Sequence, residues 1–305
     1  MGSGMKDKLK FIDLFAGIGG FHLAFHDVGA ECVFASEIDT EARKTYKTNL
    51  ESISPRIFNE KNNVLDLYND DIRKIEPDLV PDHDILCAGF PCQPFSQAGH
   101  KRGFNEQNED RGNMFFIIRD IIRAKRPKCI FLENVRHLLK HDNGRTFSII
   151  MDVLTNDLEY DVYYKIVKAS DYGLPQHRPR IFIVGFRKED NRFWNFEFPK
   201  PIPLKFTMSD VWQDKCDRDI GFTLRVGGGG SGINDRRNWD SYMVNGVVKK
   251  IGPIEGKKMM GFPDWYNFPV SKVQTMKQLG NSVAVDAVRE VAKSIINYME
   301  IKDKN

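Results

Sequence analysis

Apolar and polar positions follow two different periods along the chain between about residues 10 and 186. Short continuous apolar runs, which are typical of buried strands, predict strands at 11–15, 31–38, 84–88 and 129–132. Between these runs the apolar residues recur three and four positions apart, which predicts helices at 20–28, 40–50, 113–124 and 144–158. Strands that alternate with helices form βαβ units. The pattern therefore predicts an α/β fold with a doubly wound, mostly parallel sheet.

The pattern changes towards the end of this region. Two further predicted strands, at 162–167 and 180–186, are separated only by a loop, which indicates an antiparallel pair at one edge of the sheet. Residues 198–203 read Phe-Pro-Lys-Pro-Ile-Pro, a stiff extended connector because each proline fixes φ. The last periodic segment, at 282–299, predicts an amphipathic helix, and the N-terminal sheet is the surface that it would cover.

The segment between the connector and this last helix is therefore interpreted as an insertion. We expect one large domain made of residues 1–208 and 254–305, with a small inserted region at 209–253. The run of glycines at 227–230 is typical of a flexible linker, and its sequence leaves open whether it is natural. Residues 1–4 resemble a cloning remnant ahead of a native start at Met5.

Composition narrows the class of protein only slightly. The 45 basic and 42 acidic residues give a net charge of +3, which excludes a polybasic protein but leaves room for a local nucleic-acid-binding patch. No apolar run reaches about 18 residues and no secretory signal is visible, so we expect a cytoplasmic protein without a membrane span. The five cysteines are irregularly spaced, so the sequence predicts neither a disulfide framework nor a metal site.

A glycine-rich turn, DLFAGIGG at 13–20, follows the first predicted strand. Glycines at a strand-to-helix turn let the backbone approach a cofactor at a helix N-terminus. Glu37 closes the second predicted strand, where an acidic side chain can hold ribose hydroxyls. Together these features predict a nucleoside-cofactor site, but they are compatible with both NAD and S-adenosylmethionine.

Reactive side chains follow two more of the predicted strands and precede another. Cys92 lies in the turn GFPCQPFS, where two prolines and a glycine present the thiol instead of packing it away. Glu133 leaves a buried strand, where a carboxylate is costly without a partner or a task. Arg178 and Arg180 stand just before a strand, and each of these residues taken singly is equally compatible with a structural role. Because the carboxyl ends of parallel strands share one edge, we expect these groups to meet beside the nucleoside site.

Six segments occur in an order that resembles a known family: FIDLFAGIGG, GFPCQPFS, FLENV, QHRPRIFIVGF, MGFPD and QLGNSV. Over about residues 10–190 and 255–300 the chain resembles bacterial DNA (cytosine-5)-methyltransferases of the type II restriction–modification kind. The resemblance implies the fold of S-adenosylmethionine-dependent methyltransferases, with a target-recognition region at 209–253. It implies methyl transfer to C5 of a flipped-out cytosine in a short specific duplex DNA sequence, through a covalent adduct between Cys92 and C6.

The resemblance also implies roles for individual residues. Glu133 would stabilise the intermediate and read the edge of cytosine, with Arg178 and Arg180 close to the base and Arg180 nearest its O2. Asp66 remains an alternative to Asp71 in the cofactor site. The implied cofactor contacts are Phe15, Gly17, Gly19, Glu37, Ile38, Asp71, Ile72, Asn281 and Val283.

DNA contacts are expected from two regions. Residues 93–112 correspond to a loop that shuts over DNA, and there we expect contacts from Gln93, Ser96, Arg102 and Arg111. In the recognition region we expect contacts from Arg225, Arg236, Arg237 and Asn238, because arginine suits guanine edges and asparagine suits adenine. For each arginine a phosphate contact is an equal alternative.

Three other functions compete with this interpretation. A tRNA cytosine-5 methyltransferase of the same family would use the same chemistry, but Pro91-Cys92-Gln93 favours DNA. A nicotinamide-dependent dehydrogenase would leave Cys92 and Glu133 unexplained, and the same two residues argue against a non-catalytic DNA-binding module. We expect a monomer that acts on double-stranded DNA at the nucleoid, with a cognate restriction endonuclease as a functional partner.

Overall fold

The computed structural model describes residues 8–62, 65–92, 114–188 and 195–302. Its strands are β1 (Lys10–Leu14), β2 (Glu31–Ser36), β3 (Lys61–Asn62), β4 (Leu65–Asp66), β5 (Tyr68–Asn69), β6 (Ile85–Gly89), β7 (Cys129–Val135), β8 (Tyr160–Lys168), β9 (Pro179–Arg187), β10 (Ser241–Val244) and β11 (Val247–Lys250). Its α-helices are α1 (Gly20–Asp27), α2 (Thr40–Leu50), α3 (Pro55–Asn59), α5 (Met114–Lys125), α6 (Arg145–Asp152), α7 (Met208–Trp212), α8 (Pro253–Met259), α9 (Lys272–Asn281) and α10 (Val285–Lys302).

Seven strands form one sheet in the order β5-β2-β1-β6-β7-β9-β8. The strands from β5 to β7 are parallel, whereas β9 runs antiparallel to both of its neighbours, β7 and β8. This confirms the predicted α/β fold with a mostly parallel sheet and an antiparallel pair at one edge. Because β1, β2, β6 and β7 run parallel to one another, their carboxyl ends all open at the same edge of the sheet.

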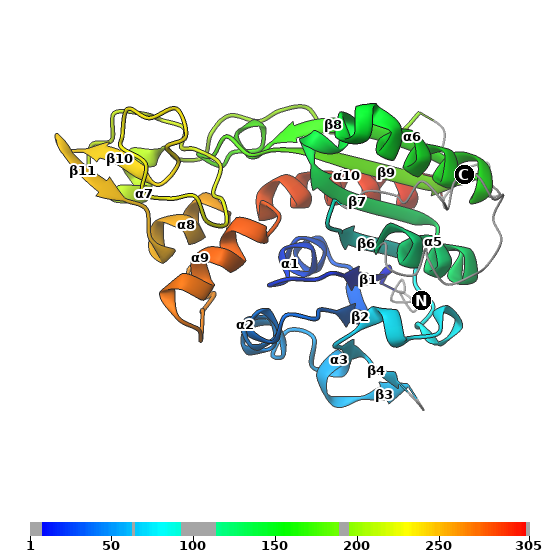
Figure 1. Ribbon diagram of the computed structural model, residues 1–305. Helices are drawn as coiled ribbons and strands as arrows, with labels where there is room; N and C mark the ends of the chain where they lie inside the picture. Colours follow the sequence, from blue (N-terminus) through cyan, green and yellow to red (C-terminus); the bar gives the residue numbers. More distant parts are fainter. Residues whose placement is uncertain (1–7, 63–64, 93–113, 189–194, 303–305) are drawn as a thin grey trace, which may run out of the picture.

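Helices cover both faces of the sheet, and the strand residues alternate between them (Figure 1). Phe11 of β1 packs into the core shared with α1 and α10, whereas Ile12 and Leu14 pack into the core shared with α5 and α6. All three side chains are fully buried. A parallel sheet that is covered on both faces in this way requires apolar residues at successive positions, which explains the continuous runs in the sequence.

A smaller lobe lies beside the sheet, at the left of Figure 1. There β10 and β11 pair antiparallel as a separate two-stranded sheet. They are joined by Asn245 and Gly246, which both have positive φ, the geometry of a tight hairpin turn. This second sheet falls within residues 209–253, while the predicted domain boundaries themselves stay a prediction.

Several bounds differ from those predicted. Strand β7 continues to Val135, so Glu133 lies inside the strand instead of after it. The last helix begins at Val285 and not at 282, because residues 282–284 connect it to α9, a helix that ends at Asn281 and that the sequence pattern did not predict. Strands β5, β10 and β11 were also not predicted.

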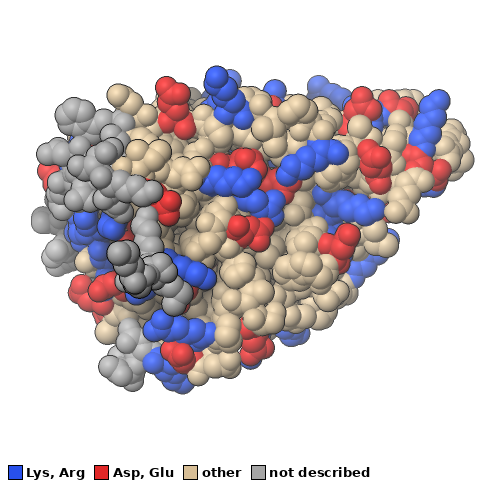
Figure 2. Space-filling view, turned by 180° about the vertical axis from the view of Figure 1, so that it is seen from behind, with Lys and Arg blue, Asp and Glu red and all other residues tan. Residues whose placement is uncertain are grey.

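Two further features of the described residues are the length of their helices and the distribution of charge on one face. No helix in the described ranges is long and apolar enough to cross a membrane. On the face drawn in Figure 2, basic and acidic side chains lie interspersed, as the small net charge of +3 suggests.

Candidate active site

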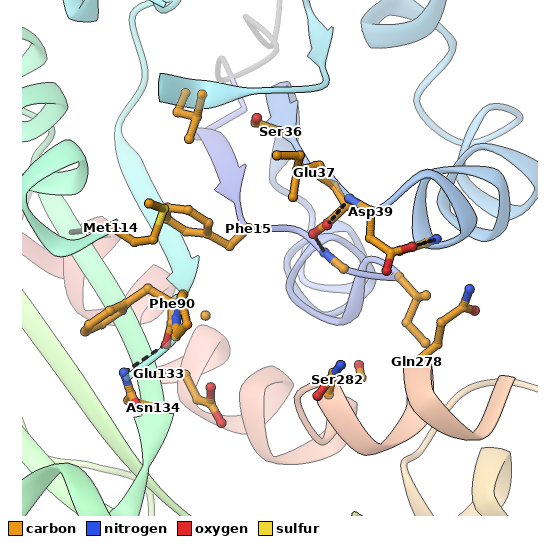
Figure 3. A pocket seen from close by; sticks show the side chains of 18 of the residues that line it. Phe15, Ser36, Glu37, Asp39, Phe90, Met114, Glu133, Asn134, Gln278 and Ser282 are labelled. Carbon is orange, nitrogen blue, oxygen red and sulfur yellow. Dashed lines mark hydrogen bonds between the residues drawn. The ribbon is translucent and has the colours of Figure 1, made fainter. Parts of the chain in front are cut away.

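One cavity of about 550 Å³ lies at the carboxyl ends of the parallel strands (Figure 3). Residues at or just beyond the carboxyl ends of β1, β2, β6 and β7 line it from the sheet, and the last turn of α9 with the residues after it closes the opposite side. Both the predicted nucleoside site and the predicted reactive groups are in this lining. They include Phe15, Gly17, Glu37, Ile38, Asp71, Ile72, Cys92, Glu133, Arg178, Arg180 and Asn281.

The turn between β1 and α1 uses its glycines for two different purposes. Gly17 has φ +54°, and a side chain built there would meet nothing within 4 Å, so its backbone is open to the cavity. Gly19 has φ +83°, and a Cβ there would clash with Leu50 of α2, so this glycine lets α2 pack closely against the turn. Gly19 does not line the cavity, and its predicted cofactor contact stays a prediction.

Glu37 is held at the cavity wall by backbone donors. The amides of Gly17 and Asp39 donate to its two carboxylate oxygens at 2.7 and 2.8 Å, as Figure 3 shows. Burial raises the pKa of Glu37, and the backbone hydrogen bonds oppose that shift. Each carboxylate oxygen accepts more than one hydrogen bond, so Glu37 keeps acceptor capacity for hydroxyl groups inside the cavity.

Apolar side chains form the neighbouring part of the wall. Ile38 is 59% exposed although it is a large aliphatic residue, and Phe15 and Ile72 line the same cavity. Phe15 adopts φ +55°, a strained conformation for a non-glycine residue and one that clusters at functional sites. Together they offer apolar contact to a flat ring.

Two predicted cofactor residues have their side chains engaged elsewhere. Both carboxylate oxygens of Asp71 accept hydrogen bonds at 2.8 Å from the guanidinium of Arg73, so the Asp71 side chain is paired within the cavity wall. Val283 is buried behind the turn, where a Cβ at Gly20 would lie 2.6 Å from its Cγ2, and it does not line the cavity. Asp66, the alternative to Asp71, pairs with Lys61 at 2.9 Å and is likewise absent from this lining.

Cys92 lies beyond the end of β6 and is only partly buried, whereas Cys32, Cys87, Cys129 and Cys216 are buried. Burial raises the pKa of the Cys92 thiol. The segment that carries it is fixed from the next strand, because the Asn134 side chain donates to the Phe90 carbonyl at 2.8 Å. Cys92 is therefore the one thiol in the described ranges that opens to the cavity.

Glu133 stands opposite Gly89 in the parallel pairing of β6 with β7, next to the segment that bears Cys92. Its Oε1 lies 3.1 Å from Nε of Arg180, an ion pair that is mostly buried. Burial raises the pKa of Glu133, while Arg180 and Arg178 act in the opposite direction. The cavity thus brings together a thiol, a carboxyl group and a guanidinium group, as the sequence predicts.

Arg178 does not behave as a group free to contact a base. It is 2% exposed, and its Nη atoms donate to the carbonyls of Leu224, Gly280 and Ser282 at 3.0, 2.7 and 2.6 Å. Burial lowers the pKa of Arg178 to about 9, so it keeps its charge at neutral pH. The guanidinium joins two segments of backbone, at Leu224 and at 280–282, and the predicted catalytic role of Arg178 stays a prediction.

The predicted DNA contacts divide into three groups. Arg225 and Arg236 are exposed, and Arg237 is exposed with its guanidinium paired to Asp235 at 2.8 Å. Asn238 is 6% exposed and its amide bonds the backbone of Ser241, so the structure does not support it as a base contact. The remaining predictions, Gln93, Ser96, Arg102 and Arg111, lie outside the described residues.

The glycine loop, residues 226–232, takes a defined path. Gly227, Gly228 and Gly230 have positive φ, and the amide of Gly230 donates to Asp240 at 2.9 Å. Left-handed backbone at three positions requires glycine, which gives the run a structural reason beyond flexibility.

Sequence reasoning missed several residues of the cavity. Asp39 caps α2 by accepting from the amides of Glu41 and Ala42, and it also pairs with Lys277 of α9 at 2.9 Å. An aspartate directly before a helical segment is an N-cap signal, and an asparagine inside a buried strand, such as Asn134, needs a hydrogen-bond partner. Among the described residues, no group of three or more His, Cys, Asp or Glu side chains is arranged to hold a metal ion.

Comparison with known proteins identifies the family. The family model described as C-5 cytosine-specific DNA methylase matches residues 9–225 and 215–297. The type II methyltransferase M.HhaI of Haemophilus parahaemolyticus is 36% identical, with 98% of each chain covered. The type II methyltransferase M.DsaV of Dactylococcopsis salina is 38% identical over 98% of this chain and 89% of its own.

Solved structures agree on the fold. A Spodoptera frugiperda DNMT2 mutant matches with a TM-score of 0.69 at 19% identity, over 95% of this chain and all of its own. The S. pombe Dnmt2 methyltransferase matches with a TM-score of 0.64 at 17% identity, over 98% of this chain and all of its own. Since the family model and the relatives each span almost the whole chain, this protein belongs to the C-5 cytosine-specific DNA methylase family, with relatives among the type II methyltransferases.

Proposed function

We propose that this S-adenosylmethionine-dependent DNA (cytosine-5)-methyltransferase carries out its reaction in the cavity lined by Glu37, Cys92 and Glu133. The observation that carries the proposal is the shared cavity itself, which has nucleoside-binding features at one end and a partly buried thiol beside a carboxyl–guanidinium pair at the other. The family match favours methyl transfer to DNA over a nicotinamide-dependent dehydrogenase and over the tRNA branch.

The first end of the cavity fits S-adenosylmethionine. The open backbone at Gly17 leaves room for close approach, Glu37 has acceptor capacity for ribose hydroxyls, and the exposed face of Ile38 suits adenine. Phe15, Ile72 and Asn281 complete the proposed contacts. When bound, the cofactor supplies the methyl group.

The second end fits a cytosine that has been turned out of the duplex, since C5 and C6 are inaccessible within the base stack. Cys92, as its thiolate, forms a bond to C6, and the ring electrons shift so that C5 becomes nucleophilic. Glu133 hydrogen-bonds N3 and the exocyclic amine and stabilises this state, and Arg180, held by Glu133, lies at O2. After methylation, C5 loses its proton and the bond between Cys92 and C6 breaks, which returns the thiolate.

Sequence recognition is assigned to residues 209–253. Arg225 and Arg236 are exposed and form no ion pair with any residue that the structure describes, so they can reach base edges or phosphates. Arg237 is exposed but would have to leave Asp235 to do so. We further propose that the protein acts as a monomer on duplex DNA of the bacterial nucleoid, alongside a cognate restriction endonuclease.

Bisulfite sequencing of DNA from cells that express the protein tests this proposal. Wild-type protein should leave 5-methylcytosine at one position of one short sequence, and Cys92→Ser should leave none while it still binds duplex DNA and cofactor. Methylation that persists in Cys92→Ser would refute the covalent mechanism. Methylation spread over unrelated sequences would instead refute the specific recognition assigned to residues 209–253.

A further inference from the structure

We infer that Arg178 is a positioning residue that couples the cofactor pocket to the glycine loop of the recognition region. This inference rests on the proposed function, since it assigns that loop to DNA. Arg178 lies between two segments that are distant in the sequence: the stem of the glycine loop, residues 221–224, and the cofactor wall, residues 280–282.

The guanidinium holds both segments at once. Nη1 donates to the Leu224 carbonyl at 3.0 Å, whereas Nη2 donates to Gly280 and Ser282 at 2.7 and 2.6 Å. Bonds from a charged donor are stronger than bonds between neutral groups, and these are fully buried. A displacement of either segment therefore has to displace Arg178 or break one of these bonds.

The stem is also fixed to the residues just before Arg178. The amide of Leu224 donates to the Gln176 side chain at 3.0 Å, and the amide of His177 donates to the Gly221 carbonyl at 2.8 Å. The other end of the Gln176 side chain donates to the Met259 carbonyl of α8 at 3.0 Å. The stem thus moves together with Arg178 and not independently of it.

Direct packing provides a second link. A Cβ at Gly280 would lie 2.8 Å from the carbonyl carbon and oxygen of Arg225, so the first exposed residue beyond the stem lies directly on the cofactor wall. Gly280 and Ser282 line the cavity, as does Arg178 itself. In the view of Figure 3, the segment that carries Gln278 and Ser282 faces Glu37 across the site.

This arrangement makes the two ligands interdependent. DNA that contacts Arg225 or the glycine loop restricts the motion of the stem. The hydrogen bonds of Arg178 then restrict the motion of the cofactor wall as well. A cofactor that orders the wall acts on the loop through the same bonds, because coupling between two binding sites is reciprocal.

Hydrogen exchange on the wild-type protein tests the first half of this coupling without any substitution. S-adenosylhomocysteine, which cannot be turned over, should slow amide exchange in residues 221–226 in the absence of DNA. Slowing that is confined to the cavity lining from β1, β2 and β6 would contradict the inference.

Calorimetric titration tests the second half. In wild-type protein a cognate duplex should tighten the Kd for S-adenosylhomocysteine by at least about fivefold, and in Arg178→Lys the effect should fall below about twofold, because one ammonium cannot reach all three carbonyls. Gly280→Ala keeps Arg178 but forces the wall away from Arg225, and it should lose the coupling as well. Arg289→Lys, which affects an ion pair between α10 and Asp27, is the matched control and should keep it.

The outcomes separate the two proposals. A wild-type protein that methylates DNA but shows neither the protection nor the coupling would overturn the role of Arg178. Arg178→Lys that loses kcat while both Kd values and their coupling stay intact would show instead that Arg178 acts on the base. If Arg178→Lys does not fold, Gly280→Ala and the exchange measurement decide. A variant that lacks the glycine loop but still binds duplex DNA normally would refute the proposed recognition region.

Discussion

At the scale of single residues, the surroundings of Glu133 act on its pKa in opposite directions. Burial favours its neutral form, while Arg180 at 3.1 Å favours the charged form. A carboxyl group balanced in this way can both accept and donate a hydrogen bond, which suits a group that reads N3 and the amine of cytosine.

Replacing Glu133 by Gln should lower kcat by about 10²–10⁴-fold, because the amide keeps the shape of the side chain but cannot take part in proton transfer. Steady-state methylation of the identified target duplex measures this, with Glu60→Gln as a control for charge removal at an exposed ion pair. A kcat within about threefold of wild type would remove Glu133 from the mechanism.

The Cys92 thiol provides a pH test. Because burial raises its pKa, the free protein holds Cys92 as a neutral thiol at neutral pH. Alkylation by iodoacetamide should therefore be slow near pH 7 and should still be increasing as the pH passes the ordinary thiol value of about 8.5.

Peptide mass spectrometry follows this reaction at each pH. Cys32, Cys87 and Cys129 are fully buried and serve as internal controls that should stay unmodified in the folded protein. A rate that levels off below about pH 8 would mean that the thiol has a lowered pKa in the free protein, contrary to the burial argument.

At the scale of elements, two glycines of the turn between β1 and α1 have different roles: Gly19 allows close packing, and Gly17 borders the ligand cavity. Gly19→Ala places a Cβ against Leu50 in a left-handed conformation, so it should lower the free energy of unfolding by about 1–3 kcal/mol. Gly17→Ala is also left-handed, at φ +54°, but its Cβ meets open space, so it should cost less stability than Gly19→Ala and should weaken cofactor binding more, because Gly17 lines the cavity.

Chemical denaturation and calorimetric titration on both variants measure the two effects. The expected pattern is a large loss of stability for Gly19→Ala and a larger loss of cofactor affinity for Gly17→Ala. The reverse pattern would show that the two glycines have been assigned the wrong roles.

Most elements of the sheet could be predicted from the sequence because periodicity and burial agree there. The run at 31–38 and the periodic segment at 40–50 correspond to β2 and α2 almost residue for residue. Helix α9 could not be predicted, because Thr275, Gln278 and Gly280 are among the residues that it buries, and these polar or small side chains give no apolar stripe. Strand β5 has only two residues, too few for any period.

Some residues of the candidate site could likewise be located from the sequence, and others could not. Cys92 and Glu133 could be located because each belongs to a short segment at a strand end. The role of Arg178 could not, because its three acceptors are backbone carbonyls from residues 46 and more positions away. Residue type suggested that Asn238 reads bases, but packing has buried its amide, which only the tertiary structure shows.

At the scale of the whole molecule, a net charge of +3 gives no strong overall field for DNA, and on the face drawn in Figure 2 charges of both signs lie interspersed. Binding must then depend on local basic side chains. Duplex affinity should still fall by at least about tenfold between 50 and 200 mM salt, because phosphate contacts release counterions. Fluorescence anisotropy with a labelled duplex measures this, and an affinity that does not change with salt would contradict backbone binding.

The central claim is that Cys92 bonds to C6 of the target cytosine, and trapping the adduct tests it most directly. A duplex that carries 5-fluorocytosine at the methylated position blocks the loss of the C5 substituent, so with S-adenosylmethionine the protein should remain attached to the DNA under denaturing conditions. Mass spectrometry should then locate the attachment at Cys92, and Cys92→Ser should give no adduct. Attachment at another residue, or full methylation of ordinary cytosine by Cys92→Ser, would contradict the account.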